Sequence, residues 1–324
     1  MNYCLYKLKF DAPVHFGPSD TALSLYSSEE HFCADTLFSA LCHSALSLGG
    51  AAQVETLCQW AREGTLLLSD SLLWQGERYF LPKPCWNGKF STEVSTQERK
   101  ALKALNWVPV SRFAAFTASL RGGAAYRETQ RSEPGRHIEV ERVRVGRQQE
   151  DAEPYYVGAF VFSEDAGLYV LAGCETEEQQ STVATLLAGL GWTGIGGKVS
   201  SGYGKFQIME AIPLSASCTG DARWLYDRLN DQTAKHHLLL TTSLPREDEM
   251  DAVMENACCQ VVRRGGFVQP GVGSNGARKK RTQYFLAAGA VLERRFSGGL
   301  FSVGDDGGAP VFRYGKPIFL GVEL

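Results

Sequence analysis

The sequence has few of the patterns that mark secreted, metal-binding or membrane-spanning proteins. Its nine cysteines are odd in number, form no C-x-x-C pair and mostly lie in apolar runs, so we expect buried thiols in a reducing cytoplasm. No run of about 18 apolar residues is present, which argues against a membrane-spanning segment. Residues 1–7 enter an alternating strand pattern directly, so we also expect no signal peptide.

The chain also lacks a complete catalytic or nucleotide-binding motif. None of the six histidines has H-x-x-x-H or His-Glu spacing and no G-x-S-x-G is present, so no metal site, cofactor or catalytic residue is predicted. The glycine-rich stretch 191–206 is not a Walker A loop, because Trp192 stands at its first glycine and Val199 at its Ser or Thr. Val199 also occupies the third glycine of G-x-G-x-x-G. These absences favour a binding protein over an enzyme.

Positive charge is concentrated in two segments of a chain whose formal net charge is −3. Residues 121–147 hold seven arginines and four glutamates, and residues 258–282 hold six basic residues and no acidic one. Such segments in an otherwise acidic chain predict local anion-binding surfaces. Charge alone leaves a second interpretation open, a pair of solvated flexible loops.

Length and hydrophobic pattern predict an α+β protein of two domains. At roughly 100–200 residues per domain, 324 residues suggest two. The order of the expected elements predicts tandem ferredoxin-like (RRM-like) domains over 1–215 and 216–324. Both are long enough to bury a core without disulfide bonds or metals.

In the first half, residues 2–10 alternate as a strand. A helix is expected from Asp35, its N-cap, to Gly49-Gly50, with a second helix over 53–63. Residues 109–120 are expected to return to a strand. The alternation Ile138–Val145 suggests one arm of a projecting β-hairpin.

The second half is expected to repeat a β–α–β–β plan. The pattern predicts a strand over 236–244, a helix over 247–256, and strands over 258–263 and 284–293. A closing hairpin is expected from residues 310–312 and 317–322.

The glycine-rich stretch predicts an RNA backbone clamp. Glycines allow backbone N–H groups to approach a phosphate, and lysine and serine side chains add donors. Tyr203 could stack on a base. The candidate residues in this loop are Gly194, Gly196, Gly197, Lys198, Ser200, Ser201, Gly202, Tyr203, Gly204 and Lys205. A glycine turn that only packs a helix on a sheet is the alternative.

Four features together resemble the RAMP superfamily of CRISPR-associated proteins. They are the helix Ala34–Leu41, the tetrapeptide Leu81-Pro82-Lys83-Pro84, the glycine-rich loop, and the segment Arg313–Val322. The loop is similar to the superfamily's G-loop. The combination more closely resembles the Cas5-like capping subunit of type III-A (Csm) effector complexes, the fourth subunit in that naming.

This resemblance implies a non-catalytic subunit in antiviral defence. Such subunits have two ferredoxin-like domains, hold the 5′ tag of the crRNA, dock the large palm-containing subunit and meet the neighbouring RAMP backbone subunit. A β-hairpin thumb, here within about 117–147, reaches across the guide–target duplex. Val140-Glu141-Arg142 departs from the Ile-Asp-Arg-like sequence of superfamily thumbs. Candidate RNA-binding residues outside the loop are His15, Arg121, Arg127, Arg142, Arg144, Lys279 and Lys280.

Two alternatives stay open. The first is a RAMP-type endoribonuclease that processes precursor crRNA, with His15 or His31 as its base. The second is the equivalent capping subunit of the type III-B complex, which would differ only in its partners.

Overall fold

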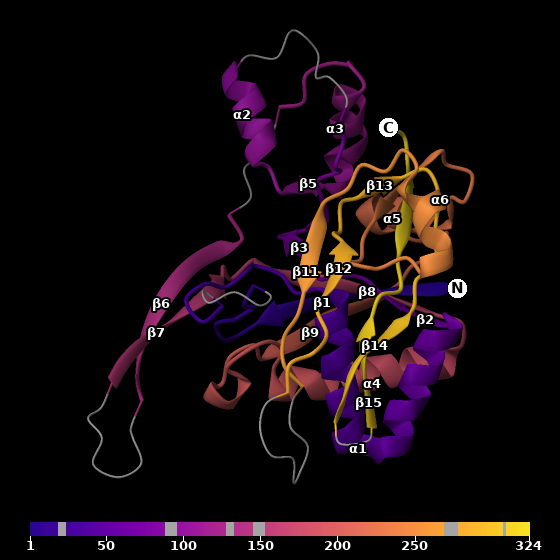
Figure 1. The fold of residues 1–324 in the computed structure, drawn as a ribbon. Helices are drawn as coiled ribbons and strands as arrows, with labels where there is room; N and C mark the ends of the chain where they lie inside the picture. Colours follow the sequence, from indigo (N-terminus) through magenta and orange to yellow (C-terminus); the bar gives the residue numbers. More distant parts are fainter. Residues whose placement is uncertain (19–23, 88–95, 128–132, 145–152, 269–277, 307–308) are drawn as a thin grey trace.

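The computed structural model describes residues 1–18, 24–87, 96–127, 133–144, 153–268, 278–306 and 309–324 (Figure 1). Its main feature is an antiparallel sheet in the order β5-β4-β3-β8-β1-β9, with β2 also paired to β8. The strands are β1 (Asn2–Phe10), β2 (Leu66–Leu68), β3 (Leu72–Gln75), β4 (Arg78–Pro82), β5 (Trp107–Pro109), β8 (Ala166–Cys174) and β9 (Phe206–Pro213).

Two helices cover one face of this sheet, α1 (Ala34–Glu63) and α4 (Glu177–Thr193) (Figure 1). The predicted alternation of β1 is confirmed, because Tyr6 and Leu8 point into the core that these helices share. Leu5 points the other way and is equally buried. It packs in a second core with residues of the C-terminal half, such as Leu225 and Leu320. The sheet is therefore buried on both faces.

The start of α1 differs from the prediction. Its N-cap is Cys33, whose side chain makes no capping hydrogen bond, so the assignment of Asp35 as N-cap is wrong. The backbone N–H of Ala34, the first residue of the helix, donates instead to Oδ1 of Asp70 at 2.8 Å. The expected break at Gly49-Gly50 is present as a kink, because Gly50 has φ 72° inside an otherwise continuous helix.

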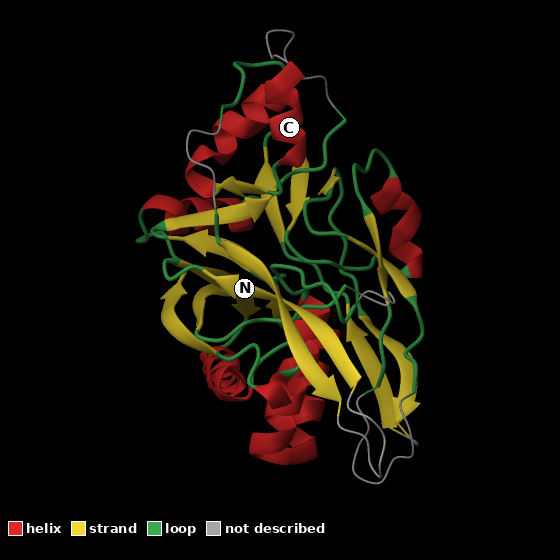
Figure 2. Cartoon of the chain, turned by 90° about the vertical axis from the view of Figure 1, so that its left-hand side faces the viewer, coloured by secondary structure: helices red, strands yellow, loops and turns green. Residues whose placement is uncertain are grey.

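A long hairpin projects from the body beside the sheet (Figures 1 and 2). It pairs β6 (Gly135–Arg144) with β7 (Glu153–Phe162), which confirms the strand predicted from the alternation at 138–145. The second arm of the hairpin, β7, lies beyond the range of 117–147 in which the thumb was expected. The strand expected at 109–120 is wrong: η1 (Val110–Arg112) and α3 (Phe113–Leu120) are helical. Phe113 and Phe116 are buried at helical spacing, three residues apart.

The described residues of the C-terminal half form three small sheets, where a β–α–β–β plan was expected. The sheets are β13-β10-β16, β11-β12 and β14-β15. The prediction of a closing hairpin is wrong, because β15 pairs with β14 and β16 pairs with β10. The remaining elements are α2 (Thr96–Ala104), α5 (Gly220–Asn230), β10 (His236–Leu239), η3 (Glu247–Glu249), α6 (Met250–Met254), β11 (Val261–Arg264), β12 (Gln283–Leu286), β13 (Val291–Leu292), β14 (Leu300–Asp306), β15 (Ala309–Tyr314) and β16 (Phe319–Val322).

Within the described residues, α1 alone is long and apolar enough to span a membrane by length and composition. Its Leu37 and Leu41 are buried against the sheet and its Gly50 interrupts the helical backbone. Packing of this kind is typical of the core helix of a globular domain.

Candidate nucleic-acid interface

The glycine-rich loop lies against the short segment that follows β1. The N–H of Gly197 donates to the carbonyl of His15 at 2.8 Å, and that of Gly204 donates to Pro13 at 2.9 Å. The same segment pairs with the root of the hairpin, since Val14 and Phe160 exchange two backbone hydrogen bonds of 2.8 and 2.9 Å. Residues 13–16 therefore join the loop to the hairpin.

The loop backbone needs its glycines at close contacts. A Cβ on Gly204 (φ 72°) would lie 2.0 Å from the carbonyl oxygen of Ile195, and one on Gly196 (φ 98°) would lie 2.8 Å from that of His15. Lys198 adopts φ 60° although it is not glycine. A left-handed lysine is strained, and such strain is concentrated at functional sites.

Lys198 and Arg142 form a small cationic pocket between the loop and the hairpin. The Lys198 Nζ lies 5.4 Å from the ring centre of Tyr155 on β7, and the Arg142 guanidinium lies 5.7 Å from that of Tyr203. Ser201 completes the lining with an exposed side chain. Two cations and hydroxyl donors around one hollow fit an anionic oxygen such as that of a phosphate.

Tyr203 corrects one expectation about stacking. Its side chain is only 5% exposed and Arg142 covers its ring. It therefore helps to position Arg142 and offers no open face to a base in this conformation. Ser200 and Lys205 are exposed, as a ligand contact requires, whereas Gly194 and Gly202 shape the backbone with positive φ.

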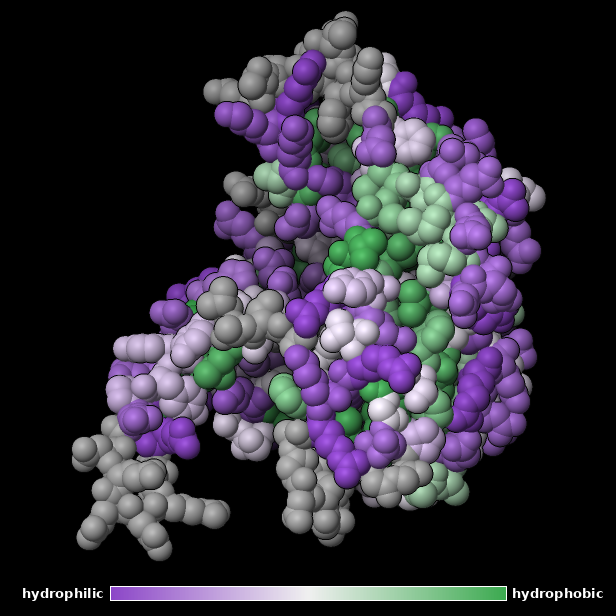
Figure 3. Space-filling model, viewed as in Figure 1, coloured by the Kyte–Doolittle hydropathy of each residue, from purple (hydrophilic) through white to green (hydrophobic). Residues whose placement is uncertain are grey.

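A wide cleft of about 1160 Å³ opens beside this pocket (Figure 3). One wall contains His15, Gly196 and Gly197 from the loop region. The other contains Val261 and Arg263 of β11. In Figure 3 the hollow lies between the projecting hairpin and the helical part above it. Its volume exceeds the roughly 300–1,000 Å³ of an ordinary small-molecule pocket.

His15 and His31 both line this cleft. His15 is 7% exposed, and its Nδ1 donates to the carbonyl of Gly158 at 2.6 Å. His31 packs edge-on against Trp107, and burial lowers its pKa. Within the part of the chain that the structure describes, no three His, Cys, Asp or Glu residues converge as a metal site would need.

Other predicted RNA-binding residues are spread over the surface. Arg121 lies 3.8 Å from Glu323, at the end of α3, and Arg127 is exposed nearby. Arg144 is exposed on the hairpin. Lys279 is exposed and Lys280 is half-buried, with its pKa lowered first by burial and then by Arg313. The fold brings Arg142, Lys198, Ser201 and Tyr203 around one pocket, with His15 bonded to Gly197 of the same loop. The pocket lining does not include Arg121, Arg127, Arg144, Lys279 or Lys280.

Sequence reasoning missed Tyr155 and gave Lys83 no role. Tyr155 was hidden because only the folded hairpin brings it to Lys198. Lys83 donates from Nζ to the carbonyls of Leu102 and Lys103, at 3.1 and 2.9 Å, and so caps the end of α2 at the cleft. In the sequence, Lys83 belongs to the Leu81–Pro84 tetrapeptide, which was used only as a feature of the family resemblance.

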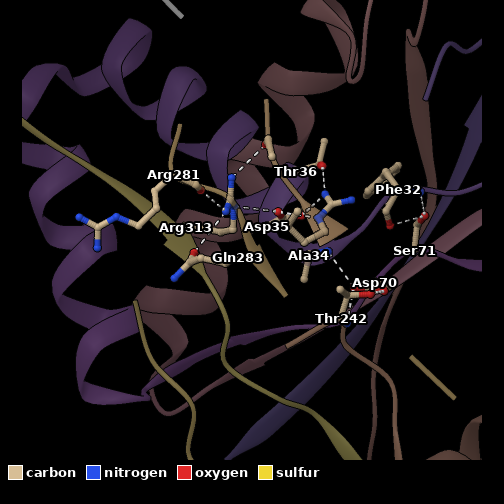
Figure 4. A network of polar contacts seen from close by, with 12 residues as sticks. Phe32, Ala34, Asp35, Thr36, Asp70, Ser71, Thr242, Arg281, Gln283 and Arg313 are labelled. Carbon is tan, nitrogen blue, oxygen red and sulfur yellow. Dashed lines mark hydrogen bonds and ion pairs between the residues drawn. The ribbon is translucent and has the colours of Figure 1, made fainter. Parts of the chain in front are cut away.

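A buried polar network holds the cleft wall to α1 (Figure 4). Arg264 of β11 donates from Nε to Oδ2 of Asp35 at 3.0 Å, and the Nε of Arg313 lies 3.6 Å from the same oxygen. Burial is the largest single effect and opposes the charge of Arg264, but the charge and hydrogen bonds of Asp35, together with Cys33 and Asp70, raise the pKa of Arg264. Arg313 also donates to the carbonyls of Arg281 and Gly265. Asp35 therefore forms ion pairs with both Arg264 and Arg313.

Curated proteins of the same family match the sequence of this chain over almost its whole length. A family model described as the CRISPR Csm4 C-terminal domain matches residues 232–322. The chain is 34% identical to the CRISPR system protein Csm4 of Mycobacterium tuberculosis, covering 99% of this chain and 98% of that one. It is 28% identical to the Csm4 protein of Streptococcus thermophilus, covering 100% of both.

Solved structures agree on the fold. The chain resembles one in the crystal structure of a Csm3–Csm4 subcomplex, with a TM-score of 0.61, 15% identity and full coverage of both chains. It also resembles one in a Csm1–Csm4 cassette bound to cA4, with a TM-score of 0.59, 19% identity and coverage of 100% and 99%. The fold thus defines the class, a mixed α+β protein with several antiparallel sheets like the solved Csm4 structures. At 34% identity over its full length, the chain belongs to the Csm4 family of type III-A CRISPR systems.

Proposed function

We propose that this chain is a non-catalytic crRNA-binding subunit of a type III-A (Csm) interference complex and that it holds the 5′ tag of the crRNA. The observation that carries the proposal is the pocket in which Arg142 and Lys198 meet beside Ser201, at the edge of a large cleft. Paired cations with hydroxyl donors position a nucleic-acid backbone without reading its sequence.

The same family membership supports a finer description of the fold. Strands β9-β1-β8-β3, with α1 and α4 on one face, have the order expected of a ferredoxin-like unit. We propose that this unit forms residues 1–215, with the hairpin β6–β7 as its thumb, and that residues 216–324 form a second, modified ferredoxin-like unit. The small separate core around Leu239 and Phe319 supports the second unit.

The proposed partners follow from the solved relatives. Those structures pair Csm4 with Csm1 or with Csm3. We propose that this chain likewise docks a large palm-containing subunit and a RAMP backbone subunit. The projecting hairpin carries exposed Arg144 and half-buried Arg142, which suits contact with a guide–target RNA duplex.

The salt dependence of RNA binding tests the proposal. The double variant Arg142→Ala, Lys198→Ala should bind single-stranded tag RNA more weakly, and its slope of log K against log salt should be shallower by about 0.7 per cation removed. Fluorescence anisotropy of labelled tag RNA at several salt concentrations measures both quantities.

A matched control removes two cations elsewhere. The double variant Lys235→Ala, Arg294→Ala loses an exposed lysine and an exposed arginine, each near a glutamate, and should bind like the wild type. Circular dichroism checks that all variants fold. Equal slopes for the pocket variant and the wild type would overturn the proposal.

A further inference from the structure

Strands β11 and β12 form a two-stranded ribbon that extends beyond its regular pairing. Past Gly265-Gly266 the chain pairs again, with a bridge between Phe267 and Lys279 and a 2.8 Å hydrogen bond from Val268 to the carbonyl of Arg278. In Figure 1 the ribbon runs down the front of the molecule from the region of β13. It forms part of the cleft wall that faces the glycine-rich loop.

One face of the ribbon is fixed to the body of the protein. Phe285 is fully buried and meets Phe301 edge-on, and Arg264 is bound to Asp35. These contacts hold the backbone in place, so the side chains of the opposite face have defined positions.

The opposite face exposes an unusual combination of side chains. Arg263 and Tyr284 are directly paired across the strands, and Tyr284 is 63% exposed. Val261 lies two residues from Arg263 on the same strand and is 57% exposed. A tyrosine ring and a guanidinium plane are both surfaces on which nucleobases stack.

The charge along the ribbon favours an anionic partner. Phe267 is 59% exposed beside the exposed Lys279. Arg278 and Arg281 are exposed as well, and Arg278 lies 2.9 Å from Asp305. No acidic residue occurs in 258–292 of the sequence. Cations that alternate with exposed aromatic rings are typical of single-stranded nucleic-acid binding.

We propose that the β11–β12 ribbon is a second RNA site, at which an unpaired nucleobase of a single-stranded segment leaving the cleft past Arg263 stacks on Tyr284, the cross-strand partner of Arg263 outside the cleft lining. This inference rests on the proposed function, because it extends the path of the same RNA from the Arg142–Lys198 pocket to the opposite wall. In this arrangement the Arg142–Lys198 pocket binds a phosphate of the RNA backbone, and the β11–β12 ribbon binds the flat face of a base.

The test measures the affinity of the full chain for a labelled short oligouridine across a salt series. Tyr284→Ala should bind about tenfold more weakly with an unchanged salt slope, because a stacking surface is lost and no charge is removed. Tyr284→Phe keeps the ring and should restore most of the affinity. Arg263→Ala should also weaken binding, because it removes the second stacking surface. Arg294→Ala, an exposed arginine outside the ribbon, is the matched control and should change nothing.

A second readout locates the contact. Oligouridine containing photoreactive 4-thiouridine should crosslink to the peptide that contains Tyr284. If Tyr284→Ala binds like the wild type and no such crosslink forms, while the pocket variant is weakened, the ribbon inference is overturned and the proposed function stands. If the pocket variant also binds normally, both are overturned.

Discussion

Asp35 and Asp70 lie near the start of α1 and have different interaction partners. Asp35 pairs with Arg264 and Arg313, whereas Asp70 accepts hydrogen bonds from the N–H groups of Ala34 and Thr242 and from the Thr242 hydroxyl. Asp70 therefore links the start of α1 to the C-terminal half. Burial raises its pKa from 3.8 to about 6, although the three hydrogen bonds oppose that shift.

The raised pKa of Asp70 makes stability depend on pH. Between the unfolded and folded pKa values the folded state binds the proton more tightly, so the free energy of unfolding should fall as pH rises through this window. Asp70→Asn keeps an oxygen for both N–H groups and cannot ionise. Relative to this variant, the wild type should lose about 2 kcal/mol between about pH 4.5 and pH 7.

Urea denaturation at the two pH values measures this difference. Asp251→Asn, which replaces an exposed aspartate, should show the pH dependence of the wild type. A wild type and an Asp70→Asn variant with parallel pH profiles would mean that Asp70 is ionised at both pH values.

Among the elements, the hairpin β6–β7 depends least on the core. Most side chains of β6 are exposed or half-buried, while the last residues of β7, including Phe160 and Phe162, are buried at the root. A two-stranded ribbon is only marginally stable by itself. The hairpin therefore serves as an extension that the body supports.

Shortening this hairpin should separate folding from RNA binding. Replacing residues 142–155 with Asn-Gly joins Glu141 to Tyr156, which are partners in the register, and leaves the root intact. The melting temperature should change by only about 2 °C, because little apolar surface is lost. Affinity for a guide–target RNA duplex should fall about tenfold, which corresponds to 1.4 kcal/mol.

Calorimetry measures the melting temperature of the shortened variant, and fluorescence anisotropy measures its affinity for the guide–target RNA duplex. A large drop in melting temperature would show that the arms stabilise the body. Unchanged duplex affinity would show that the hairpin is not the thumb.

At the scale of the whole molecule, the two halves are joined by a shared hydrophobic cluster. Leu5 and Leu171 of the central sheet pack with Leu238 and Leu320 of the C-terminal half. The buried network of Asp35 and Asp70 crosses the same boundary. The cleft is consequently a property of the complete chain, since its walls come from both halves.

The complete chain should leave repeat RNA intact, with or without Mg²⁺. His15 is only 7% exposed and His31 packs edge-on against Trp107, so access of a ribose hydroxyl to either ring is restricted. Gel analysis of labelled repeat RNA after incubation with the purified protein measures this. Specific cleavage that is lost in His15→Ala or His31→Ala would favour the endoribonuclease alternative.

Local patterns in the sequence were sufficient where neighbouring residues decide the structure. The alternation of residues 2–10 and 138–145 gave two strands, and the glycines of the loop indicated a backbone with close contacts. Prediction failed at α3, because its short apolar run fits a helix or a strand and only its packing decides. It failed at β14–β15 because strand pairing joins residues that no local pattern connects.

By itself, the sequence determined the mixed α+β class, the helix α1 with its break at Gly50, the glycine-rich loop and the family, because these depend on periodicity and on motifs in a fixed order. Only the tertiary structure decided which cations meet. Arg142 and Lys198 are 56 positions apart in the sequence, and they line one pocket, Arg142 over Tyr203 and Lys198 over Tyr155, because residues 13–16 hold the hairpin root to the loop. The burial of Tyr203 and the partners of Asp35 were decided in the same way, since burial and ion pairing depend on which distant surfaces pack together.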